Sequence, residues 1–204
     1  MPRELHIPRG DVNDVELHVI DFRGERIGSY YIGRIWLGAS TESAYGADFR
    51  DITSSFYGHA CLYPHAGEIW RRWASGKSIE PSEWSQYPRN SHASWLHVVQ
   101  TAWFESGHSA IRYGMEDTVA INGGTISSTA DFYCAIGEAV NGAGGYFGSS
   151  LDSLADCLSS SWESRTSFRI IWNDSSVSCE FLEEEFVMSV LTLMQEHGVE
   201  VSLR

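Results

Sequence analysis

One stretch decides how the second half of this 204-residue chain folds: Tyr146-Phe147-Gly148-Ser149-Ser150-Leu151-Asp152-Ser153-Leu154-Ala155-Asp156-Cys157-Leu158. The stretch begins within a glycine-rich loop, Gly142 to Gly148, and we expect a helix to begin near Ser149 or Ser150. The apolar side chains of that helix would lie within about a third of its circumference on a 100° wheel, and this spacing predicts a buried stripe. The stripe consists of Leu151, Leu154, Ala155 and Leu158.

Strands and helices alternate on both sides of this stretch. Upstream, the sequence predicts a strand over Thr118–Ile121, an Asn122-Gly123-Gly124 turn, and a helix that starts at the capping-box-like Ser128-Thr129-Ala130-Asp131. Downstream, it predicts a strand over Phe168–Trp172, a helix from Cys179 to His197 ended by Gly198, and a strand over Val199–Leu203. This alternation is typical of an α/β domain with a small, mostly parallel sheet and helices packed on it.

The first half of the chain is different and carries six of the eight tryptophans. Alternating residues predict a β-hairpin from Val15–Phe22 and Ile27–Leu37, and further short elements follow. These are a helix starting at Ile69–Trp73, a turn and short helix at Glu80–Trp84, and a strand at Trp95–Gln100. We therefore expect a β-biased α+β region over 1–115 and an α/β domain over 116–204, with the boundary between Glu105 and Met115.

Charge is distributed unevenly between these two parts. Residues 1–115 hold 13 acidic and 11 basic residues, a net of −2, whereas residues 116–204 hold 14 acidic and 3 basic residues, a net of −11. Nucleic acid and anionic membranes repel such a surface, whereas a basic protein attracts it. Acidity can also simply favour solubility.

Asp152 and Asp156 are four residues apart, so they share one shoulder of the expected helix. Like charges at this spacing destabilise a helix by about 0.2–0.5 kcal/mol. No Lys or Arg lies within four residues of either aspartate. A pair of like charges that destabilises its own helix, with no basic residue nearby in sequence to compensate, suggests a functional site. Two solvated aspartates, or a metal site with thin support, are the other interpretations.

Val119-Ala120-Ile121-Asn122-Gly123 and the stretch from Tyr146 to Leu158 together resemble the barstar family of ribonuclease inhibitors. The likeness covers residues 117–204 and implies a three-stranded parallel sheet flanked by helices. It also implies that Asp152 and Asp156 face a nuclease, with Asp156 where a substrate phosphate would sit. The implied nuclease-binding residues are Tyr146, Phe147, Ser150, Asp152, Ala155, Asp156 and Glu196, although we expect Phe147 to lie in the core.

Two positions depart from the family pattern. Ser150 stands where the family usually has Asn, and Ala155 stands where barstar has an exposed aromatic residue. Either change could weaken binding or alter the preferred nuclease. The sequence therefore leaves open a second hypothesis, a non-inhibitory interaction module that binds another basic protein.

A third hypothesis is an enzyme in the first half, which holds seven of the eight histidines. Gly58-His59-Ala60-Cys61 with His65 could suggest a metal site, but the spacing matches no zinc pattern. The four cysteines are scattered singly, and we expect buried free thiols. No signal peptide or membrane span is recognisable, so we expect a cytoplasmic protein.

These observations favour a stoichiometric inhibitor with no catalysis of its own and no cofactor. Its expected partner is a secreted or toxin ribonuclease of basic charge, with no binding to nucleic acid or membrane. Its role would be immunity against that enzyme.

Overall fold

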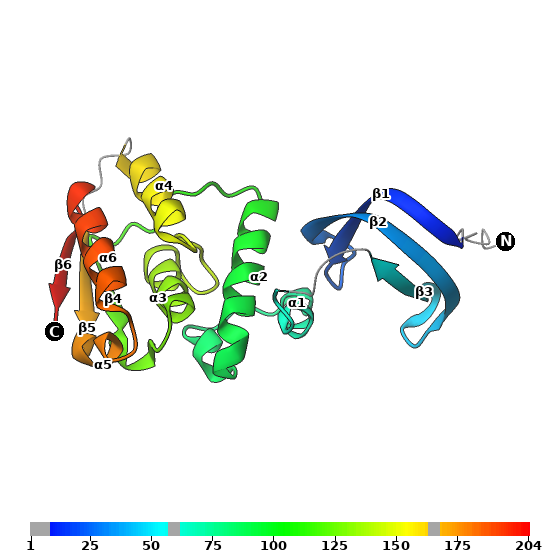
Figure 1. Ribbon diagram of the computed structural model, residues 1–204, viewed down its shortest axis with the longest axis horizontal. Helices are drawn as coiled ribbons and strands as arrows, with labels where there is room; N and C mark the ends of the chain where they lie inside the picture. The colour runs from blue at the N-terminus through cyan, green and yellow to red at the C-terminus, as the bar shows by residue number, and fades with distance from the viewer. Residues whose placement is uncertain (1–8, 57–61, 163–167) are drawn as a thin grey trace. The chain divides into compact units, whose positions relative to one another are not determined.

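The computed structural model describes residues 9–56, 62–162 and 168–204 (Figure 1). The chain divides into two compact units. Unit 1 comprises Met1–Val19 and Ser29–Leu62, and unit 2 comprises Ile20–Gly28 and Tyr63–Arg204.

Unit 1 is a three-stranded antiparallel sheet in the order β1-β2-β3. Its strands are β1 (Gly10–Ile20), β2 (Arg26–Ser43) and β3 (Gly46–Phe56), the ends of β1 and β2 belonging to unit 2. The predicted hairpin is confirmed, and Asp21 N–H donates to Glu25 O at 2.9 Å across its turn. The sequence did not reveal β3, because its apolar residues are few and all of its described side chains are exposed.

From Tyr63 onward, unit 2 continues with helices, one of which takes the place of the strand expected at Trp95–Gln100. These are α1 (Ala66–Ala74), the short helices η1 (Glu83–Gln86) and η2 (Arg89–Ser91), and α2 (His92–Glu105). The strand prediction was wrong because α2 packs against α1 on one side and α3 on another. Trp95, Leu96, Val98 and Val99 are all buried, so the helix lacks the single apolar stripe that marks an amphipathic helix.

The second half of unit 2 is the predicted parallel sheet, in the order β4-β5-β6. Its strands are β4 (Thr118–Asn122), β5 (Arg169–Asn173) and β6 (Glu200–Leu203), with Val119 opposite Ile170 and Ile170 opposite Val201. Three helices flank it (Figure 1): α3 (Thr129–Asn141), α4 (Leu151–Trp162) and α6 (Glu184–Glu196). One face of β4 and β5 is buried, through Val119, Ile121, Ile170 and Trp172.

The last helix starts later than its apolar spacing predicted. A short helix, α5 (Ser175–Cys179), comes first, and α6 begins only after the extended residue Glu183. Leu182 is four residues before Phe186, which fits helical spacing. It nevertheless belongs to the loop between α5 and α6, from which its side chain is buried in the core. Glu184 and Glu185 occupy the first turn of α6, where carboxylates complement the helix dipole. Gly198 follows the helix with φ +73°, as expected.

The cysteine prediction is confirmed for Cys134 and Cys157, which are free and buried, but is wrong for Cys179, which is exposed. Burial raises the pKa of the Cys157 thiol to about 12, with a further contribution from Asp156. Within the described ranges, no helix has both the length and the apolar character to cross a membrane.

Candidate functional site

The loop before α4 is held close to that helix by its last glycine. Gly148 has φ +99°, and a Cβ at this position would lie 2.9 Å from Cα of Leu154. Any side chain would therefore be strained and would push α4 away. The loop thus delivers Ser149 and Ser150 to the start of the helix.

Two serines cap α4 by reciprocal hydrogen bonds. Ser153 N–H donates to Ser150 Oγ at 3.2 Å, and Ser150 N–H donates to Ser153 Oγ at 2.8 Å. This is the arrangement of a capping box with Ser in the place of Glu or Gln. Ser150, the first departure from the family pattern, therefore helps to start the helix that carries the two aspartates.

Both aspartates are exposed on α4, one turn apart. Asp152 lines a shallow groove between α4 and α6, while the stripe residues Leu154 and Leu158 face the core. Leu151 and Ala155 were expected in the buried stripe, but both are only half-buried and line the groove instead. The small side chain of Ala155 leaves this groove open.

The groove is lined by both acidic and apolar side chains. Its residues from α4 are Leu151, Asp152 and Ala155, and those from α6 are Glu185, Met188, Ser189, Thr192, Leu193 and Glu196. No Lys or Arg is among them, whereas three are carboxylates. The groove therefore suits a basic side chain with an aliphatic stem.

The structure brings Asp152, Ala155 and Glu196 together, with Asp156 exposed one turn farther along α4. It does not bring the aromatic pair to the surface. Tyr146 is 2% exposed and packs edge-on against Phe104 with ring centroids 5.4 Å apart, and Phe147 is 0% exposed. Phe147 is thus in the core as expected, and Tyr146 is buried where the glycine-rich loop meets Phe104 of α2.

Sequence reasoning missed Glu185 and Met188, which line the groove from α6. Met188 is 57% exposed, an unusual position for a large apolar side chain. A signal was present, because residues 185, 188, 192 and 196 recur at helical spacing. The signal is weak because the buried residues of α6, Val187, Val190 and Met194, dominate the apolar spacing of the helix.

Asp131 plays a different part from the one expected in a capping box. Ser128 does cap α3, accepting from the Asp131 N–H at 3.2 Å, but the Asp131 carboxylate points elsewhere. It accepts from Ser127 N–H at 2.8 Å and lies 2.6 Å from Nδ1 of His92. Nε2 of His92 donates to the carbonyl of Tyr87 at 3.0 Å, and both members of this pair are buried. The pair therefore joins α2 to α3.

The described residues contain no group of three or more His, Cys, Asp or Glu side chains that could hold a metal ion. The sequence Gly58-His59-Ala60-Cys61, considered as a metal site, lies outside the described residues.

Fold and site together define a small parallel α/β domain whose exposed feature is an acidic groove between two helices. The family model described as Barstar (barnase inhibitor) matches residues 116–202. The match confirms the resemblance over the C-terminal half of the chain, and this half carries a domain of an inhibitor family. No curated protein and no solved structure matches the chain.

Proposed function

We propose that the protein is a ribonuclease inhibitor whose acidic helix α4 occupies the substrate-phosphate site of a basic ribonuclease. The observation that carries this proposal is the groove between α4 and α6, whose described lining residues include three carboxylates and no basic side chain. The family match over residues 116–202 supports a ribonuclease as the partner in general.

The chemistry of the target explains why carboxylates suit this role. A ribonuclease places Arg, Lys or His at the scissile phosphate to stabilise developing charge. The Asp152 and Asp156 carboxylates on a rigid helix imitate that phosphate and accept charge-assisted hydrogen bonds from the same groups. The chain performs no reaction, so inhibition is stoichiometric.

Charge also acts at longer range. The net of −11 over residues 116–204, from 14 acidic and 3 basic residues, steers the domain toward a basic enzyme. Salt screens this attraction over about 8 Å at physiological ionic strength, so association slows as salt rises. A cell that makes or meets such an enzyme would use this protein for immunity in the cytoplasm.

The test is a titration of the full chain into barnase, following RNA cleavage at low and moderate salt. We expect one-to-one inhibition, a slower onset at higher salt, and loss of affinity by at least about 30-fold in Asp156→Asn, corresponding to ~2 kcal/mol. Glu200→Gln is the matched control, because it removes one charge from an exposed residue of β6 that pairs with Arg169.

Equal inhibition by Asp156→Asn and the wild type would refute the phosphate-mimic mechanism. If the wild type binds barnase without blocking RNA cleavage, the domain is instead an interaction module. Ala155 is the reason to test this second function, because it stands where the family pattern has an exposed aromatic residue.

A further inference from the structure

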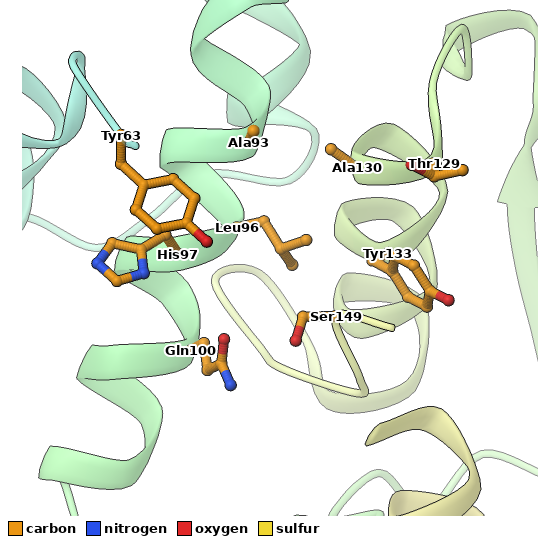
Figure 2. A pocket seen from close by; sticks show the side chains of 9 residues that line it. All are labelled: Tyr63, Ala93, Leu96, His97, Gln100, Thr129, Ala130, Tyr133 and Ser149. Carbon is orange, nitrogen blue, oxygen red and sulfur yellow. The ribbon is translucent and has the colours of Figure 1, made fainter. Parts of the chain in front are cut away.

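A second concave site lies in unit 2, between α2 and α3 (Figure 2). One side of the pocket is formed by Tyr63 and by three residues of α2: Leu96, His97 and Gln100. The other side is formed by residues of α3 and by Ser149 from the loop before α4. The remaining lining residues are Ala93, Thr129, Ala130 and Tyr133.

This pocket adjoins the acidic helix. Ser149 lines the pocket and donates its N–H to Ser153 Oγ of α4 at 2.7 Å. Tyr133 also lines it, and burial together with the charges of Tyr146 and Asp152 raises its pKa far above the usual value.

The size of the pocket limits its occupant. Its volume is about 190 Å³. Small-molecule and cofactor sites commonly span roughly 300–1,000 Å³. The pocket therefore suits one side chain better than a nucleotide or a cofactor.

The chemistry of the lining favours a planar cation. The rings of Tyr63 and His97 are stacked, with centroids 3.9 Å apart and planes within 6°, and offer an aromatic surface. Burial lowers the pKa of His97, so the ring adds no positive charge at neutral pH. Gln100, Thr129 and Ser149 supply oxygen acceptors, and the lining residues that the structure describes include no Lys or Arg. A guanidinium group both stacks on aromatic rings and donates several hydrogen bonds.

We infer that this pocket receives one arginine side chain of the nuclease that binds the α4–α6 groove. The inference rests on the proposed function and extends its binding face onto α2, which lies outside the matched residues 116–202. The helix α2 then serves as a specificity element that the barstar pattern does not contain.

The first test compares two alanine-to-tryptophan variants in the barnase titration. Ala93→Trp places a bulky ring at the exposed rim of the pocket, while Ala120→Trp places the same ring on an exposed position of β4. We expect Ala93→Trp to weaken inhibition by about tenfold or more and Ala120→Trp to leave it unchanged. Gln100→Leu, which removes an acceptor without adding bulk, gives a second reading, and circular dichroism verifies folding of each variant.

The second test does not depend on inhibition. N-acetyl-arginine amide is titrated at millimolar concentration into the ¹⁵N-labelled full chain. We expect amide shifts at Leu96, Gln100 and Tyr133 that disappear in Ala93→Trp. Absence of these shifts, or unaltered barnase inhibition by both Ala93→Trp and Gln100→Leu, overturns the inference. If the wild type fails to inhibit barnase while the arginine shifts are present, the proposed function fails with that enzyme and the pocket stands.

Discussion

Asp152 and Asp156 contribute to the proposed binding of a nuclease, but their mutual repulsion lowers the stability of α4. Both side chains are exposed, and the cap formed by Ser150 and Ser153 holds the first turn of α4 without help from either carboxylate. Asp152 still gains from the helix dipole in that first turn, but Asp156 lies beyond it. Folding stability therefore does not explain why position 156 is an aspartate.

We expect Asp156→Asn to leave the free energy of unfolding unchanged or to raise it by about 0.2–0.5 kcal/mol, because a like-charge pair is removed. Urea unfolding at neutral pH measures this, with Asp152→Asn as the comparison that also loses the dipole interaction. A loss above ~1 kcal/mol in Asp156→Asn would show that the carboxylate has a structural role.

At the scale of elements, an ion pair ties α1 to η1. Arg72 Nε donates to Glu83 Oε1 at 2.6 Å and Nη2 donates to Oε2 at 2.9 Å. The same guanidinium donates to the carbonyls of Lys77 and Ser78 at 3.0 and 2.6 Å, so one side chain organises the whole connection. Burial opposes ionisation of Glu83, but the Arg72 hydrogen bonds, the Glu80 N–H and the Arg72 charge outweigh it and lower the pKa of Glu83.

This lowered pKa predicts an acid-sensitive contribution to stability. A carboxyl with a depressed folded-state pKa stabilises fully above its unfolded pKa, about 4.3, and loses that effect as pH falls through the folded value. We expect Glu83→Gln to cost about 1.5–3 kcal/mol at pH 7. The gap between wild type and variant should shrink below about pH 4. Urea unfolding from pH 7 to pH 3 measures it.

The exposed Glu68→Gln is the control for this series, because Glu68 makes no hydrogen bond to Arg72. A wild-type advantage that stays constant across the whole pH range would mean that Glu83 acts through packing and not through its charge.

At the scale of the whole molecule, residues 63–115 form one compact unit with residues 116–204. The boundary expected between Glu105 and Met115 therefore separates two segments that pack together through α2 and α3. The buried His92–Asp131 pair crosses it, as does the edge contact between Phe104 and Tyr146. The division of the chain into domains over 1–115 and 116–204 stays a prediction.

We expect the fragment 116–204 to be less stable than the full chain by at least about 3–5 kcal/mol, since it leaves the Asp131 carboxylate without its histidine partner. Thermal melts followed by circular dichroism compare the two. The full chain carrying His92→Ala separates the effect of the pair from the loss of α2 packing. Equal melting temperatures for the fragment and the full chain would establish residues 116–204 as an independent domain.

The sequence by itself determined most of the second half of the chain. Alternating strands and helices, a glycine-rich loop and a terminal glycine predicted the parallel sheet, α3, α4 and the end of α6, because these features act over a few neighbouring residues. Spacing also placed Asp152 and Asp156 on one side of the same helix, but their role in binding a nuclease was implied by the family resemblance and stays a prediction. Such local signals survive folding when one face of each element meets the core.

Only the tertiary structure decided what depends on neighbours distant in sequence. Burial on several sides turned the Trp95–Gln100 segment into helix α2, and the buried position of Tyr146 depends on Phe104 of that helix. The groove formed because α6 lies beside α4, and the second pocket formed because α2 covers α3. Hydrophobic periodicity reports which residues are buried but not what buries them, so these surfaces could not be derived from one sequence.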